Sequence, residues 1–261
     1  MRKIFAFTSV FSIAFSFLPV VLNGQTSTPP PAAMLQSGDL LFPKKKGAVV
    51  PYNSKPGQAG DQEAEEWQKE RDEYLASLKS KPEVDEQEKE RFLVLENMSY
   101  PEFLGLYLDD EPLKGTASFG NGPASTGHVG IVEITEGGPT VVEAIMGTGV
   151  RRISYADWIK DRPDELVWLG RLKGIPADRR TAVAKFAATM IGKPYRFFNF
   201  DLKDDSGFYC SKLAWLSIVN SAGFAPDGND NPKRLLWYSP KQLLHSIRLE
   251  LLVNPGNYGT K

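Results

Sequence analysis

The chain contains a single cysteine, Cys210, so no disulfide within the chain can hold its fold together. A polar loop, Asp204–Gly207, precedes this residue, and an apolar run with helical spacing, Leu213–Val219, follows it. The pattern predicts that Cys210 lies in the first turn of a helix, where free N–H groups and partial positive charge favour a thiolate. A buried, unreactive thiol is the alternative, because a lone cysteine commonly behaves as a small core residue.

Residues 1–24 have the layout of a secretory signal peptide. The basic segment Met1–Lys3 precedes an apolar stretch, Ile4–Leu22, and Gly24 offers a small residue for cleavage. Serines and Pro19 interrupt the apolar stretch, which argues against an uncleaved membrane anchor. We therefore expect an exported protein, periplasmic or extracellular, with no stable membrane anchor after signal cleavage.

The composition narrows the functional classes. Cleavage after Gly24 would leave about 237 residues, enough for one domain with insertions. A formal net charge of −1 gives no electrostatic case for a nucleic-acid partner. Two histidines and one cysteine leave few soft ligands for zinc, so we expect neither a metal nor another cofactor. With no disulfide available, burial of aliphatic and aromatic side chains must stabilise the domain.

The chain after the signal peptide divides into three parts: a mobile Thr-, Pro- and Ala-rich linker (25–36), the main domain (37–253) and a short tail (254–261). The domain begins with a turn and a short strand, Ser37–Phe42, that Pro43 is expected to end. Residues from about 43 to 125 are expected to form an insertion packed on the main sheet. Within it, Lys81–Pro82 should separate two helical pieces.

Two predicted strands carry a histidine and a glutamate that are candidates for the same site. Thr126–Glu133 reads as a strand with His128 at its start, and Gly137–Gly138 reads as a hairpin turn. The returning strand, Thr140–Ile145, carries Glu143, which could face His128 across the sheet. The ordinary reading of a histidine at a strand edge is a satisfied structural residue, but a carboxylate in a buried strand needs a partner. Such a pair would fix the imidazole tautomer and leave its other nitrogen free to face a thiol.

Further elements follow the same kind of pattern. The sequence predicts a short helix at 153–159, a strand at 165–171, an amphipathic helix at 176–191, a helix at 239–246 and a last strand at 248–253.

Five segments occur in the order of a known family: Ser37–Phe42, Gly127–Val132, Val142–Ala144, Gly192–Tyr195 and Tyr209–Leu213. Together they resemble the circularly permuted NlpC/P60 papain-like amidases of the YiiX/YaeF-like group. The resemblance covers most of 37–253 apart from the insertion. It implies an α+β fold in which an antiparallel sheet packs on helices, here with a helical insertion. It also implies that histidine precedes cysteine in the chain.

The resemblance assigns roles to individual residues. Cys210 matches the nucleophile, His128 the base, and Glu143 the third, orienting residue. Tyr195 matches an aromatic residue near the active site and is expected to bind substrate. Two positions depart from the family pattern. Arg196 stands where an acid is common, and Lys212 stands where the family commonly has glutamate. Both exchange a negative for a positive charge near the site, which leaves the substrate open.

Three functions remain after this reading. The first is an exported cysteine hydrolase that cleaves an amide, for example in a cell-wall peptide, through a thioacyl-enzyme. The second is a lipid acyltransferase or thioesterase on the same fold, and the third is a non-catalytic binding module. The substrate would accordingly be a small molecule, a peptide or a lipid. The segment Asp61–Tyr107 is expected to form a lid or partner surface beside the site.

Overall fold

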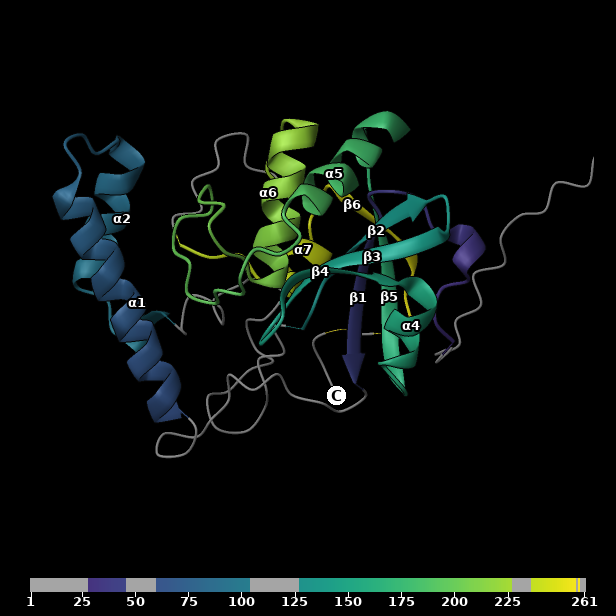
Figure 1. Cartoon of the computed structure of the whole chain (residues 1–261), viewed down its shortest axis with the longest axis horizontal. Coiled ribbons are helices and arrows are strands. Elements are labelled where there is room, and N and C mark those ends of the chain that lie inside the picture. The colour runs from purple at the N-terminus through teal and green to yellow at the C-terminus, as the bar shows by residue number, and fades with distance from the viewer. Residues whose placement is uncertain (1–27, 46–59, 104–126, 227–235, 257, 259–261) are drawn as a thin grey trace, which may run out of the picture.

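The computed structural model describes residues 28–45, 60–103, 127–226, 236–256 and 258. Its centre is a six-stranded sheet with the order β4-β3-β2-β1-β5-β6, in which every neighbouring pair is antiparallel (Figure 1). The strands are β1 (Leu40–Lys45), β2 (Gly130–Thr135), β3 (Gly138–Ile145), β4 (Gly149–Ser154), β5 (Glu165–Leu172) and β6 (Leu249–Val253).

Helices cover both faces of this sheet. The described helices are α1 (Gly60–Ser80), α2 (Glu86–Glu96), α4 (Tyr155–Lys160), α5 (Ala177–Thr189), α6 (Cys210–Ala222) and α7 (Pro240–Leu244), with a 3₁₀ turn at Ala32–Met34. Because neighbouring residues of a strand point to opposite faces, Val142 packs with α5 and α6, whereas Val141 packs with α4. The arrangement is an α+β fold in which an antiparallel sheet packs on helices, as expected from the sequence.

Helix α6 is the central helix of the larger core. Its residues are apolar on nearly every side, and most are buried against α5, α7 and strands β2 and β3. The helix ends at Gly223, whose φ of 77° is the left-handed conformation that favours glycine at a helix C-terminus. Cys210 is its first residue, so the predicted position of the cysteine is confirmed.

Strand β1 differs from the prediction at its end. Pro43 does not stop the strand, which continues to Lys45 and pairs with β5 throughout. On the edge of β1 that faces β2, only Leu40 and Leu41 are paired, so beyond Leu41 this edge has no strand that requires N–H donors from β1. A proline is tolerated at such an edge position. The predicted insertion therefore begins after β1.

Strand β4 was not predicted, because its flanking Gly147 and Gly149 indicated only a turn. The alternation of Val150, Arg151, Arg152 and Ile153 was the available signal, and the structure pairs this segment with β3 along its whole length. Its first residues are buried and the later ones alternate between half-buried and exposed.

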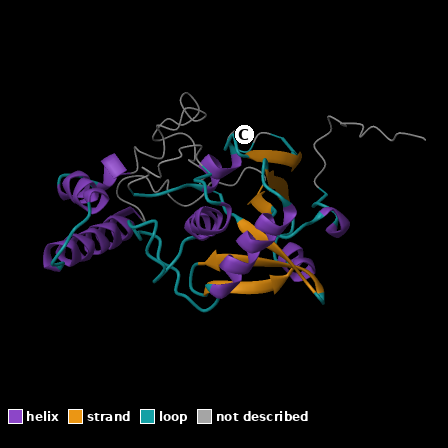
Figure 2. Ribbon diagram, turned by 90° about the horizontal axis from the view of Figure 1, so that it is seen from above, coloured by secondary structure: helices purple, strands orange, loops and turns teal. Residues whose placement is uncertain are grey.

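The insertion contains the two predicted helices, α1 and α2, separated near Pro82. Figures 1 and 2 show this pair to one side of the sheet. The aromatic residues of its described part meet a phenylalanine-rich loop, and the packing of the whole insertion on the main sheet stays a prediction. Trp67 and Tyr74 contact Phe200, with ring centroids 6.4 and 6.1 Å apart.

The predicted linker is packed on the domain from Pro30 onward. Leu35 is buried, the Tyr155 hydroxyl donates a hydrogen bond to the Pro30 carbonyl at 2.6 Å, and Arg171 donates to the Met34 carbonyl at 3.0 Å. This part of the segment is therefore not a mobile linker. The predicted signal peptide lies outside the described residues. No helix in the described ranges is both long and apolar enough to cross a membrane.

Candidate active site

His128 and Glu143 lie on the same face of the sheet. Ile131 pairs with Val142, so Gly130 lies opposite Glu143 and His128 comes two residues earlier with the same side-chain direction. The two side chains meet, with His128 Nε2 2.8 Å from Glu143 Oε2. Glu143 is completely buried, whereas the His128 side chain is 23% exposed. The sheet register therefore creates the pair that the sequence predicted.

Cys210 approaches the imidazole from α6, which packs on the other face of the sheet. Because Glu143 occupies Nε2, the ring nitrogen left for the thiol is Nδ1, and the sulfur hydrogen-bonds with His128. The backbone N–H groups of Val129 and Ser211 also donate to the sulfur. The structure thus brings together the three residues Cys210, His128 and Glu143 at the end of the sheet where β2 begins.

The electrostatics of the pair favour a thiolate and an imidazolium. Burial alone would raise the pKa of the Cys210 thiol, but the charge and hydrogen bond of His128 outweigh it, so this pKa lies below its ordinary value. Burial would lower the pKa of His128, yet the thiolate and the Glu143 carboxylate raise it to about 9. At neutral pH the proton therefore resides on the imidazole.

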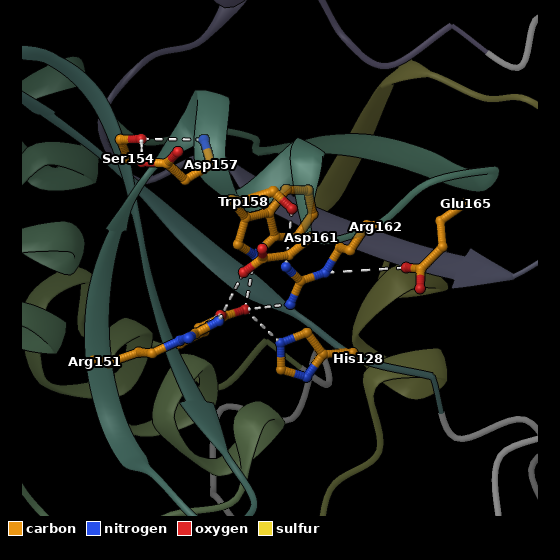
Figure 3. A network of polar contacts seen from close by, with 9 residues as sticks. His128, Arg151, Ser154, Asp157, Trp158, Asp161, Arg162 and Glu165 are labelled. Carbon is orange, nitrogen blue, oxygen red and sulfur yellow. Dashed lines mark hydrogen bonds and ion pairs between the residues drawn. The ribbon is translucent and has the colours of Figure 1, made fainter.

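Glu143 accepts hydrogen bonds from four side chains at once (Figure 3). Its Oε2 accepts from His128 and also from Trp158 Nε1 at 2.7 Å and Arg162 Nη2 at 2.8 Å. Its Oε1 accepts from Arg151 through Nε at 3.0 Å and Nη2 at 2.8 Å. Burial would raise the pKa of this carboxyl, but His128 and the two arginines lower it to about 2. Glu143 is therefore a permanent anion at physiological pH.

Sequence reasoning did not identify Arg151, Trp158 or Arg162 as site residues. Arg151 is the cross-strand partner of Glu143 in β3 and β4, so it became visible only once β4 was known. Trp158 and Arg162 come from α4 and the turn that follows it. Only the buried carboxylate itself, which requires compensating donors, pointed to such partners.

Tyr195 lies beside the segment that enters α6. It forms a parallel bridge with Phe208, and the flanking residues exchange backbone hydrogen bonds with Phe208, from Arg196 N at 3.1 Å and to Pro194 O at 3.0 Å. The Tyr195 side chain is half-buried and packs against the core. Its bridge partner, Phe208, precedes Cys210 by two residues, so Tyr195 lies close to the start of α6. The substrate-binding role of Tyr195 stays a prediction.

The two departures from the family pattern have different surroundings. Arg196 is 2.5 Å from Glu70 of α1 and so ties the insertion to the loop before Cys210. Lys212 is completely buried, and its Nζ makes no hydrogen bond. Its nearest carboxylate is that of Asp204 at 3.9 Å. Burial lowers the pKa of Lys212 to about 7.

Tyr258, from the C-terminal tail, also contacts the site. Its hydroxyl oxygen accepts a hydrogen bond from the His128 backbone N–H at 3.3 Å. A side chain at position 127 would collide with this hydroxyl, since a Cβ on Gly127 would lie 1.6 Å from it. The tyrosine is fully buried against Trp168, with ring centroids 4.8 Å apart. The predicted tail therefore forms part of the wall behind His128.

A cavity of about 310 Å³ lies between α1 and the loop that precedes Cys210. Its lining is mainly polar and charged: Glu70, Glu73, Tyr74, Ser77, Lys81, Arg196, Phe198, Asn199, Phe200, Asp201, Asp204 and Ser206. Cys210 and His128 do not line it. Across the described ranges, no three or more His, Cys, Asp or Glu residues are grouped so that they could hold a metal ion.

Comparison with known proteins bears on the segment that holds this site. A family model described as permuted papain-like amidase enzyme, YaeF/YiiX, C92 family, matches residues 116–234. The chain is also similar to a solved structure titled as metalloprotein yiiX from Escherichia coli O157:H7, with 16% sequence identity and a TM-score of 0.44. That similarity covers 84% of this chain and 96% of the other. A search of curated proteins gave no match.

The matched segment contains Cys210, His128 and Glu143. Over this segment the chain matches the permuted papain-like amidase family of the YaeF/YiiX type, so the resemblance read from the sequence is confirmed. The chain is accordingly an enzyme of the cysteine peptidase and amidase class.

Proposed function

We propose that this chain is an exported cysteine hydrolase in which Cys210, His128 and Glu143 cleave an amide bond through a thioacyl-enzyme. The observation that carries the proposal is the continuous hydrogen-bonded chain from the Cys210 sulfur through His128 to the buried Glu143 carboxylate. This is the order of groups that an activated thiol requires: nucleophile, base and orienting acid.

The first half-reaction begins with the thiolate. The sulfur attacks the substrate carbonyl carbon and forms a C–S bond, while the carbonyl π electrons move to oxygen. The backbone N–H of Cys210, at the start of α6, would hold this oxyanion. When the oxyanion collapses, the C–N bond breaks and the His128 imidazolium gives its proton to the departing amine. The acyl group remains on Cys210.

The second half-reaction returns the enzyme to its starting state. His128, now neutral, takes a proton from water, and the resulting oxygen nucleophile attacks the thioester carbon. Collapse of this intermediate breaks the C–S bond and releases the carboxylic acid and the Cys210 thiolate. Glu143 stays ionised throughout and holds the Nε2 side of the ring, so that Nδ1 keeps facing the sulfur.

We favour a peptide substrate, such as one from the cell wall, over a lipid acyl chain because of the match to the permuted amidase family. The polar cavity beside the loop that precedes Cys210 is lined by neither Cys210 nor His128, so it does not decide the substrate. A lipid acyltransferase or thioesterase would use the same three residues but would require an apolar channel for the chain. The signal-like residues 1–24 support export to the periplasm or the exterior.

Reaction of the single thiol with iodoacetamide tests the nucleophile directly. Because Cys210 is the only cysteine, the added mass reports one site without a background from others. Labelling at pH 7 should be fast in the wild type and about tenfold or more slower in His128→Ala, because the Cys210 thiol loses the base that accepts its proton.

His245→Ala is the matched control, since it removes the other histidine of the chain, which is exposed. It should label like the wild type. Equal rates for His128→Ala and the wild type would overturn the proposed dyad. Turnover of blocked peptide amides but not of a long-chain acyl thioester is expected, and the reverse preference would favour the lipid alternative.

A further inference from the structure

The carboxylate oxygen that binds the imidazole also binds a guanidinium. Oε2 of Glu143 is 2.8 Å from His128 Nε2 and 2.8 Å from Arg162 Nη2. The cation and the ring therefore lie within two hydrogen-bond lengths of each other. In Figure 3, His128 and Arg162 point toward the same place from different elements.

Arg162 is held rigidly in this position. Its Nη1 donates to the Trp158 carbonyl at 3.0 Å, and its guanidinium lies 4.1 Å from the centre of the Trp158 ring. Its Nε is 4.0 Å from Glu165, and its side chain is only 10% exposed. Such a fixed, poorly solvated cation acts on its neighbours with little screening.

Arg151 is placed differently, although it bonds the same carboxylate. It donates only to Oε1, on the side away from the imidazole, and its side chain is 31% exposed. It also lies 3.9 Å from Asp161, which offsets part of its charge. Arg162 should therefore act on His128 more strongly than Arg151 does.

The remaining groups that face His128 come from other elements. The Cys210 thiolate on α6 favours the protonated ring, as does Glu143 on β3. The Tyr258 hydroxyl of the tail contacts the His128 backbone and stays neutral, because burial raises its pKa. Arg162 is thus the nearest fixed cation opposing protonation of the ring, with Glu165 as its distant counter-charge.

We propose that Arg162 is a positioning residue that holds Glu143 against the imidazole and limits how basic His128 becomes. The proposal rests on the triad function proposed above. A like charge beside the imidazolium makes proton release easier, and the guanidinium also withdraws electron density from the oxygen that the ring bonds. His128 can then both retain the thiol proton and surrender it to the departing amine.

Direct titration of His128 by NMR tests this inference without a substrate. The chain has only two histidines, so histidine-selective labelling gives two imidazole signals, and His245→Gln assigns them. In Arg162→Gln the pKa of His128 should rise by about one pH unit, because a cation is lost while Glu143 keeps its bonds to Arg151 and Trp158. Arg151→Gln should produce a smaller rise.

Arg152→Gln is the matched control. Arg152 lies next to Arg151 on β4, but it pairs with Glu133 at 2.7 Å and not with Glu143. It should leave the His128 titration unchanged. A merely structural Arg162 would let Glu143 drift away, so the pKa of His128 would fall in Arg162→Gln. A fall or an unchanged value would overturn the inference, provided that the variant unfolds cooperatively.

Iodoacetamide labelling separates the two proposals. If wild-type Cys210 labels slowly and without dependence on His128, the proposed function fails. If labelling is fast and depends on His128, but His128 titrates at the same pH in Arg162→Gln and the wild type, only the role of Arg162 fails. The expected result is fast, His128-dependent labelling together with a His128 titration moved to higher pH in this variant.

Discussion

The carboxyl group of Glu143 has no access to solvent, and this fact governs the chemistry around it. An isolated carboxylate in such a place would take up a proton rather than stay charged. Here two guanidinium groups, an indole N–H and the imidazole all donate to it, and the pKa of Glu143 is lowered to about 2. Glu143 is therefore ionised whether or not the imidazole is protonated.

Glu143→Gln is expected to lose both activity and stability. The neutral amide cannot accept from every donor, and it leaves the poorly exposed Arg162 with only Glu165, 4.0 Å away, as a counter-charge. Iodoacetamide labelling of Cys210 at pH 7 should slow about tenfold, and the free energy of unfolding in urea should drop by about 3 kcal/mol.

Glu133→Gln is the control, because Glu133 pairs with Arg152 in the neighbouring part of the sheet. Its unfolding free energy should change by less than about 1 kcal/mol, as expected for a partly exposed pair. A Glu143→Gln variant that labels at the wild-type rate would show that the carboxylate does not orient His128.

The meeting of Cys210, His128 and Glu143 could be predicted from the sequence, whereas the residues that support them could not. Cys210 is the only cysteine of the chain and stands where the sequence predicts a helix to begin. His128 and Glu143 lie on two strands that a predictable hairpin joins. Arg162 carries no local signal, because its role exists only after α4 folds back over β3. Contacts between residues distant in the chain are set by packing, which a local pattern does not encode.

At the scale of elements, the same limit explains β4 and the tail. Local alternation was present in β4, but its glycines indicated a turn. The tail showed no pattern, yet Trp168 Nε1 donates to Asn254 Oδ1 at 3.1 Å and to the Gly256 carbonyl at 3.0 Å. Lys44 Nζ donates to the Tyr258 carbonyl at 2.6 Å. These bonds fix the tail against β1 and β5.

Tyr258→Ala should destabilise the domain and loosen the wall behind His128. The ring is fully buried between Phe42 and Trp168, so its removal should cost about 3–5 kcal/mol in urea unfolding. Tyr258→Phe keeps the ring and removes only the acceptor for the His128 N–H, which should cost about 1 kcal/mol. Similar losses in both variants would contradict the packing role of the ring.

The helical pair α1 and α2 packs against the loop that leads into Cys210. Glu70 and Trp67 of α1 bind the loop 196–206, which leads into Cys210. Lys203 of that loop donates to Gln87 of α2 at 2.9 Å. The insertion is therefore coupled to the segment that precedes the nucleophile, and its action as a lid or partner surface stays a prediction.

For the whole molecule, the pH dependence of stability follows from protons bound in the folded and unfolded states. The pKa of His128 is raised from 6.5 to about 9, so its stabilisation is present below pH 6.5 and is lost as the pH rises toward 9. The pKa of Cys210 is lowered from 9.0, so its contribution has the opposite dependence on pH and offsets that of His128.

Glu143 contributes at the acid end. Its pKa is lowered from 4.5 to about 2, so its stabilisation is present above pH 4.5 and is lost as the pH falls toward 2. Lys212 also makes the free energy of unfolding rise with pH, but in the alkaline range. Burial lowers its pKa from 10.5 to about 7, so between these values the unfolded chain binds a proton that the folded chain does not. Stability should therefore rise with pH above 7.

Lys212→Met isolates this contribution, because methionine fills similar space without a charge. The variant should be more stable than the wild type at pH 7, by about 1–3 kcal/mol, since a buried amine without a hydrogen bond is removed. The advantage should shrink by about 1 kcal/mol for each pH unit between 7 and 9, measured by urea unfolding.

Lys185→Met provides the comparison, because the Lys185 side chain is exposed on α5. Its unfolding free energy should track the wild type across the range. A Lys212→Met variant whose advantage is constant with pH would mean that Lys212 stays protonated in the folded protein. In that case Asp204, 3.9 Å away, would have to supply the compensating charge despite the missing hydrogen bond.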